Sequence, residues 1–108
     1  MTGEWDAVER ELAQRERHAV FRTAIAALRP VIEWIKADDR LVDLRPSVSL
    51  GSLVFRRGSG RAVLLHWNEQ DGYRLSHLAP GFEIVNTRQV AQEDLVDVLR
   101  VYLDDAVG

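Results

Sequence analysis

A β-hairpin between Arg61 and Leu78 constrains the fold of this chain more than any other feature of its sequence. Two runs in which apolar residues alternate with polar ones flank the short segment Glu69–Gly72. Alternation with a period of two is typical of half-buried strands, and a glycine that ends a short polar loop is typical of a hairpin turn. The sequence therefore predicts an antiparallel sheet at the centre of the fold.

The apolar side chains of this hairpin also predict which residues pair across it. With Gly72 in the left-handed conformation of a bulged type I turn, Trp67 faces Leu75 and Leu65 faces His77. That register gathers five apolar side chains on the face toward the core: Val63, Leu65, Trp67, Tyr73 and Leu75. The opposite face carries a mixed set: Ala62, Leu64, His66, Arg74, Ser76 and Leu78. A half-apolar sheet face is a common docking surface, so we expect a partner or a second copy to bind there.

The first 38 residues have the spacing of one long amphipathic helix, over residues 4–38. Apolar residues recur at steps of three and four, at Phe21, Ile25, Leu28, Ile32 and Ile35. Pro30 lacks an amide hydrogen and its ring clashes with the preceding turn. We therefore expect a kink, or a break into two helices, near Arg29.

Two further elements complete the predicted fold. The apolar residues of 48–57 change parity at Gly51, which predicts one strand with a bulge at the glycine. Residues 87–104 predict a closing helix, with Asn86 and Gln89 as its capping box. The expected architecture is a single α+β domain over residues 1–108. It consists of a long N-terminal helix, a three-stranded antiparallel meander and a C-terminal helix, with a short fourth extended segment as an option at residues 82–85.

Composition excludes several classes of protein. The chain has 108 residues, of which 46% are hydrophobic and 29% charged, an ordinary balance for a folded domain. It contains no cysteine, which excludes disulfides, thiolate zinc sites and cysteine nucleophiles. No apolar run is long enough to span a membrane, and the acidic start is unlike a signal peptide. We expect a cytoplasmic protein without a membrane partner.

Charge is distributed unevenly along the chain. The net charge is −3, but residues 40–61 hold five arginines against one aspartate, and residues 81–108 hold six acids against two arginines. Two regions of opposite charge favour self-association or a charged partner. The alternative is that both are ordinary solvated surfaces.

No catalytic or metal-binding constellation is visible, so we expect a non-enzymatic protein without cofactors. The three histidines are His18, His66 and His77, and the last two lie on opposite faces of the predicted hairpin, where they cannot share a metal ion. Ser76 and His77 are neighbours on a strand, so their side chains diverge and do not form a nucleophile–base pair.

An arginine-rich turn is the main candidate for anion or nucleic-acid binding. Three arginines surround the segment Gly58–Gly60, and a fourth lies on a neighbouring strand; they are Arg56, Arg57, Arg61 and Arg74. Guanidinium groups beside glycine amides are suited to phosphate or carboxylate. The alternative is a turn charged for solubility. The placement of Trp67 and Tyr73 on the core face is unfavourable for single-strand recognition, which uses exposed aromatic residues.

Four residues are candidates for a protein interface: Trp5, Leu64, His66 and Leu78. The last three belong to the mixed face of the hairpin. Trp5 stands near a polar terminus, where it either folds back on the core or anchors a partner. The function predicted from the sequence is a protein-interaction module, with a homodimer or a protein partner, and nucleic-acid or phosphorylated-ligand binding is the alternative.

The hairpin resembles a motif of a small uncharacterised actinobacterial domain, W-x-E-x-x-G-aromatic. The matching residues are Trp67, Glu69, Gly72 and Tyr73. The resemblance covers about residues 48–104 and implies a helix, an antiparallel sheet and a closing helix, with no known activity. It agrees with the abundance of arginine over lysine and of alanine and valine, which is typical of a GC-rich host or phage genome.

Overall fold

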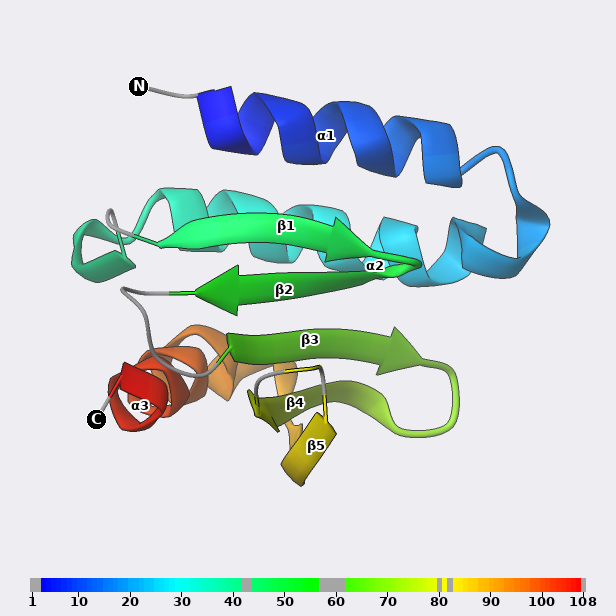
Figure 1. The fold of residues 1–108 in the computed structure, drawn as a ribbon. Coiled ribbons are helices and arrows are strands. Elements are labelled where there is room, and N and C mark those ends of the chain that lie inside the picture. Colours follow the sequence, from blue (N-terminus) through cyan, green and yellow to red (C-terminus); the bar gives the residue numbers. More distant parts are fainter. Residues whose placement is uncertain (1–2, 42–43, 57–61, 80, 82, 108) are drawn as a thin grey trace.

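The computed structural model describes residues 3–41, 44–56, 62–79, 81 and 83–107. Two α-helices come first, followed by five strands and a third α-helix (Figure 1). Their bounds are α1 Gly3–Arg15, α2 Ala19–Lys36, β1 Arg45–Ser49, β2 Ser52–Arg56, β3 Ala62–Asn68, β4 Gly72–Ala79, β5 Glu83–Val90 and α3 Leu95–Val107. Short 3₁₀ turns at Asp39–Leu41 and Gln92–Asp94 follow α2 and precede α3. The α+β class and the C-terminal helix are thus confirmed.

The five strands form one antiparallel meander in the order β1-β2-β3-β4-β5. In Figure 1, α1 lies alongside β1 and α2 crosses behind the sheet, while α3 lies near β3 and β4. All three helices contribute to one core cluster with the inward-facing side chains of the strands. None of the helices in the described ranges has the length and apolar character that a membrane crossing requires.

The predicted number of three strands was wrong, for two local reasons. The expected single strand over 48–57 is a hairpin, in which Leu50 and Gly51 form a two-residue turn between Ser49 and Ser52. The turn, rather than a bulge, accounts for the change of parity at Gly51. The second error lies at residues 83–90, which form a fifth strand paired with β4. Residues 83–85 belong to the optional extended segment of the prediction, whereas residues 87–90 were expected to begin the last helix.

The closing helix accordingly begins at Leu95, eight residues later than expected. Asn86 and Gln89 are not a capping box, because both lie in β5. A 3₁₀ turn leads into the helix, with the Asp94 amide donating to the Ala91 carbonyl at 3.0 Å. Leu95, Leu99 and Leu103 form the buried stripe of this helix.

The long N-terminal helix was also wrong, because the chain breaks at residues 16–18 and not at Pro30. α1 packs mainly on β1 and α2 on β3, so their apolar stripes need two different axes. α2 continues through Pro30, which is exposed. On the solvent side of a helix, water can bind the Ala26 carbonyl that a proline leaves without an amide partner.

The predicted faces of the hairpin are confirmed, although its predicted register was wrong by two residues. Trp67 pairs with Tyr73 and Leu65 with Leu75, which preserves parity and therefore the faces. The Asn68 side-chain oxygen accepts a hydrogen bond from the Asp71 amide at 2.7 Å. This contact closes a shorter turn than expected, and Gly72, with φ of 69°, takes the left-handed position.

One buried tyrosine ties the sheet to α2. Tyr73 is nearly buried in the core, and its hydroxyl donates a hydrogen bond to the Ala27 carbonyl at 2.7 Å. Burial disfavours the phenolate and raises the pKa of Tyr73 above its ordinary value of 10.0. The contact lies one turn before Pro30, so it holds the proline-containing part of α2 against β4.

Candidate functional site

An apolar groove lies where the β1–β2 turn and the end of β3 meet the beginning of α2. Its volume is about 540 Å³, within the usual range of binding sites. Five hydrophobic side chains supply most of its wall: Val20, Phe21, Leu50, Leu64 and Trp67. Its polar lining residues include Ser52, His66 and Glu69. We call this site the Leu50 groove.

The turn at the rim of the groove holds a leucine in a strained conformation. Leu50 has φ of 54°, and no other non-glycine residue in the described ranges has a positive φ. A left-handed conformation costs an L-residue about 1–2 kcal/mol. The first central position of a two-residue hairpin turn with this geometry normally holds glycine. Here the glycine stands second, at Gly51, and leucine occupies the strained position.

Close packing against α2 explains why Gly51 is glycine. A Cβ atom at this position would lie 2.7 Å from Cδ1 of Phe21. The turn is therefore pressed against the phenylalanine ring and cannot shift to relax Leu50 without losing this contact. The strained leucine nevertheless leaves 64% of its surface exposed, and Val20 beside the groove is 80% exposed.

A hydrogen-bonded pair of side chains forms the polar part of the groove. The Ser52 hydroxyl lies 3.0 Å from Nδ1 of His66 on the neighbouring strand. Sequence reasoning missed Ser52 because it placed this residue in the middle of a strand. The register Leu53–Leu65 puts Ser52 beside His66, so a correct turn at Gly51 would have found the pair.

The Ser52–His66 pair places a hydroxyl and an imidazole together at the groove. In a catalytic triad a carboxylate hydrogen-bonds to the histidine and orients it. Within the part of the chain that the structure describes, no carboxylate makes a hydrogen bond to His66. The hydroxyl and the imidazole remain as a donor and acceptor for one polar group of a ligand.

The electrostatics of the groove are set by one acid. Glu69 is the charged side chain among the described lining residues, and it is exposed at the β3–β4 turn. Asp71 in the same turn is already engaged, because its carboxylate contacts Arg74 at 3.2 Å and the Asn68 amide at 3.4 Å. The groove therefore presents one carboxylate without a nearby basic lining residue.

The predicted interface residues lie in different environments. Leu64 and His66 both line the Leu50 groove, as part of the mixed face of the hairpin. Leu78 is only 2% exposed, because it packs with Val54 and Ala62 in a small cluster on that face. Its side chain is thus inaccessible to a partner in this structure.

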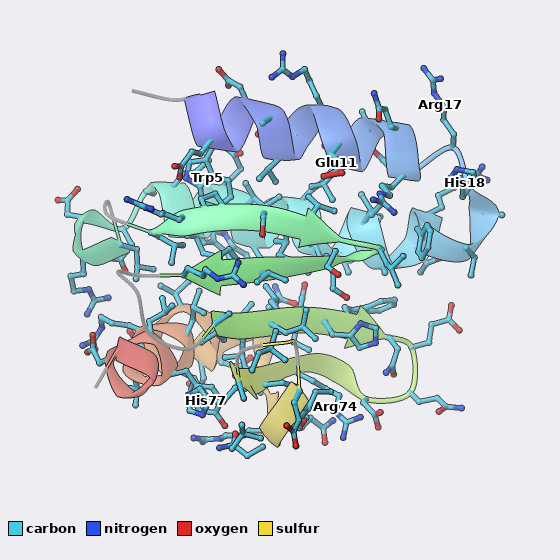
Figure 2. All side chains as sticks on the ribbon, in the orientation of Figure 1. Trp5, Glu11, Arg17, His18, Arg74 and His77 are labelled. Carbon is cyan, nitrogen blue, oxygen red and sulfur yellow. The ribbon has the colours of Figure 1, made fainter. Side chains whose placement is uncertain are left out.

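Trp5 folds back on the protein. It is half-buried against the core, with its ring centroid 6.5 Å from that of Phe55, and Figure 2 shows it between α1 and the sheet. The packing favours the structural interpretation of this tryptophan over that of a partner anchor.

The arginine candidates do not converge in the described part of the chain. Arg57 and Arg61 lie outside the described residues. Arg74 pairs with His66 toward one end of the strands, whereas Arg56 stands at the other end, where it pairs with Arg45. Figure 2 shows Arg74 on the side of β4 and β5. Its guanidinium contacts the Asp71 carboxylate at 3.2 Å. Arg45, which was not among the arginine candidates from the sequence, lies directly opposite Arg56.

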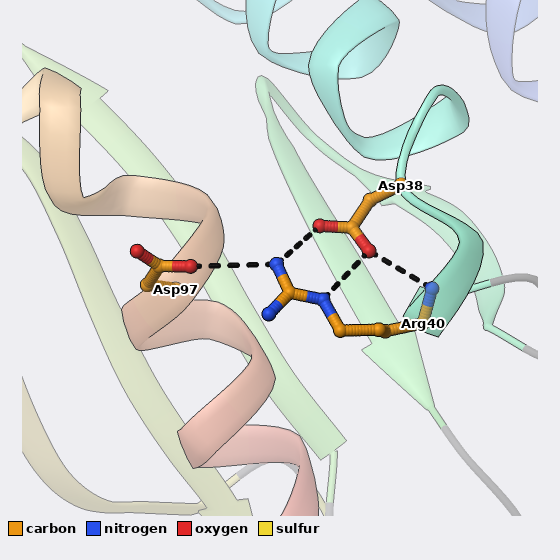
Figure 3. A network of polar contacts seen from close by, with 3 residues as sticks. All are labelled: Asp38, Arg40 and Asp97. Atoms are coloured by element: carbon orange, nitrogen blue, oxygen red, sulfur yellow. Dashed lines mark hydrogen bonds and ion pairs between the residues drawn. The ribbon is translucent and has the colours of Figure 1, made fainter.

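One contact joins the basic and acidic regions of the sequence at the surface of the molecule. Arg40 donates to Asp38 through Nη2 at 2.7 Å and through Nε at 3.0 Å, and it contacts Asp97 of α3 at 3.4 Å (Figure 3). Hydrogen bonds from the side chain and backbone amide of Arg40 lower the pKa of Asp38 from 3.8 to about 2. The same contact raises the pKa of the Arg40 guanidinium. One arginine of the basic region thus contacts one acid of the acidic region, between the 3₁₀ turn after α2 and α3.

The histidines do not form a metal site. His77 is buried and stacks on the Tyr102 ring with centroids 4.2 Å apart. It pairs with Val63 on β3, three residues from His66, so the two histidines lie on opposite faces of the sheet. Its Nε2–H donates to the Tyr102 carbonyl and its Nδ1 accepts from the Asn86 amide, both at 3.1 Å. Among the described residues, no three His, Cys, Asp or Glu side chains are grouped to hold a metal ion.

Comparison with protein-family models, with curated proteins and with solved structures finds no match for this chain. The likeness of the hairpin to an actinobacterial domain stays a prediction, and the function is argued from the groove.

Proposed function

We propose that this protein is a non-catalytic protein-interaction module, and that the Leu50 groove holds a short segment of its partner. The observation that carries the proposal is the conformation of Leu50. The chain places a large apolar side chain where glycine would be unstrained, and leaves most of that side chain exposed beside a groove. Strained residues of this kind cluster at ligand clamps and other functional sites.

The surroundings of Leu50 support a binding role. Val20 and Leu50 are exposed, while Phe21, Leu64 and Trp67 are partly buried and anchored in the core or the sheet. Lining side chains that are already packed against the core need little reorganisation when a segment enters. The Ser52–His66 pair gives the polar groups of such a segment a hydrogen-bonding partner.

A peptide selection tests this proposal. Wild type, Leu50→Gly and Val101→Ala are each used to select from a random peptide library displayed on phage. Val101 is also an exposed hydrophobic residue, but it lies on α3 outside the groove. We expect wild type and Val101→Ala to enrich the same apolar peptides and Leu50→Gly to lose them. Equal enrichment by all three proteins, or none by any, would contradict the proposal.

Anion binding is a second candidate, favoured by one observation. Arg45 and Arg56 are exposed and directly opposite each other on β1 and β2. Two guanidinium groups placed opposite each other can both donate to one bound phosphate or carboxylate. We propose to measure the anisotropy of labelled RNA and DNA with wild type and with Arg45→Gln/Arg56→Gln. Binding that weakens with salt and is lost in the variant supports the candidate, and equal binding by both proteins contradicts it.

A further inference from the structure

We infer that the segment held by the Leu50 groove is apolar and carries a lysine or arginine that lies against Glu69. The inference rests on the proposed function and adds the chemistry of the partner. Its starting point is charge: the groove combines a hydrophobic wall with a single lining carboxylate, at the β3–β4 end.

The hydrophobic wall defines one half of the ligand. Val20 and Leu50 are the exposed hydrophobic residues of the lining, one from α2 and the other from the β1–β2 turn. Aliphatic side chains that pack against them are removed from water, at roughly 25 cal/mol per Å² of apolar surface buried. A polar segment would instead leave Val20 and Leu50 facing unpaired polar groups, which costs free energy.

Glu69 defines the other half. The carboxylate of the nearby Asp71 already contacts Arg74 and Asn68, and Asp71 does not line the groove. The carboxylate available to an occupant of the groove is therefore that of Glu69. A cationic residue of the segment gains a complementary charge there, and an acidic residue meets a like charge. The segment therefore combines aliphatic residues with an adjacent base.

The polar pair orients the bound segment. The Ser52 side chain is nearly buried and its hydroxyl is held by His66, so both groups are fixed before a ligand binds. A backbone carbonyl or amide of the segment can hydrogen-bond to this pair while its side chains occupy the apolar wall. Preorganised polar groups of this kind set the orientation of a ligand more than its affinity.

Three synthetic peptides test the inference. They share one apolar core obtained from the peptide selection and differ in a single flanking residue, which is lysine, glutamine or glutamate. Fluorescence anisotropy gives the Kd of each for wild type, Glu69→Gln, Glu69→Lys and Glu83→Gln. Glu83 is an exposed acid on β5, outside the groove, and serves as the matched control.

We expect wild type and Glu83→Gln to bind the lysine peptide about two- to fivefold more tightly than the glutamine peptide at low salt. Glu69→Gln should remove this preference and Glu69→Lys should reverse it toward the glutamate peptide. Salt near 1 M should also remove it, because the charges are exposed.

Two results would overturn the inference and leave the proposed function intact. One is equal affinity for all three peptides in wild type, or a preference that Glu69→Lys does not reverse. The other is a dimer in sedimentation velocity that Leu50→Gly dissociates, because a second copy would then fill the groove. A selection that yields no peptide core contradicts the proposed function itself.

Discussion

Replacing Leu50 by glycine and by alanine separates the strain of the β1–β2 turn from the packing of the side chain. Since Leu50 is 64% exposed, about a third of the side chain is buried. Full burial of a leucine is worth about 1.5–3 kcal/mol, so the loss of this contact costs about 0.5–1 kcal/mol in either variant. Leu50→Ala keeps the left-handed conformation with its Cβ, and it should be less stable than wild type by this amount.

Leu50→Gly also loses the contact, but it relieves about 1–2 kcal/mol of strain. Against this stands the additional freedom that glycine has in the unfolded chain, about 0.5–1 kcal/mol relative to alanine. The free energy of unfolding of the glycine variant should therefore lie within about 1 kcal/mol of the wild-type value. It should exceed that of the alanine variant by about 0.5–1 kcal/mol. At a position with negative φ the alanine variant is the more stable of the two.

Urea unfolding followed by far-ultraviolet circular dichroism measures both variants without relying on Trp67, which lines the groove. Gln70→Gly and Gln70→Ala provide the control pair, because Gln70 is exposed in the β3–β4 turn and has no positive φ. There alanine should be the more stable. If Leu50→Ala equals or exceeds Leu50→Gly in stability, the left-handed conformation is not a source of strain and the argument for the groove loses its main support.

Three further predictions follow from the packing and the ionisable groups. Gly51→Ala should lower the free energy of unfolding, measured in urea, by about 1–3 kcal/mol, because its Cβ would overlap Phe21. The same substitution in a Phe21→Ala background should cost less, and an equal cost in both backgrounds would contradict the overlap. Tyr73→Phe should cost about 0.5–1.5 kcal/mol. The raised pKa of Tyr73 makes wild-type stability fall as pH rises above 10.0, and this fall should be absent from the variant. The lowered pKa of Asp38 gives stability that is present above pH 3.8 and lost as pH falls through about 2. Asp38→Asn should therefore flatten the acid part of the stability profile measured in urea at several pH values. An unchanged profile would show that the contact of Asp38 with Arg40 does not contribute to the acid dependence.

Local periodicity was sufficient for some parts of this fold. The alternation around Glu69–Gly72 defined the central hairpin and its faces, because parity survives a register error of two residues. The stripe of Leu95, Leu99 and Leu103 likewise defined the core face of the last helix. Both patterns depend only on neighbours in the sequence.

Other parts depended on contacts between distant residues. β5 is exposed at every position except Val90, so it shows no apolar alternation, and only its pairing with β4 makes it a strand. The turn at Gly51 is fixed by Phe21, thirty positions earlier in the chain. The break after Arg15 follows from the different positions of α1 and α2 on the sheet.

The candidate site was predictable only in part. Leu64 and His66 were selected correctly as residues of a mixed sheet face, and both line the groove. Leu50 fell within the single strand expected over 48–57, because the exposure of Val20 and Leu50 depends on how α2 and the turn meet. Leu78 shares the parity of Leu64 yet is buried, which parity alone cannot distinguish.

The short link between α1 and α2 makes α1 the natural first segment to detach. α1 lies along β1, one of the two edge strands of the sheet. It holds that position through Val8, Leu12 and the ion pair of Glu9 with Lys36 at 3.5 Å. Partial opening of such a unit requires less free energy than global unfolding. Its departure would leave an uncovered strand edge, which is a template for pairing with other chains. The aggregation rate of this protein should therefore rise as the hydrogen-exchange protection of α1 falls, even among variants with the same free energy of complete unfolding.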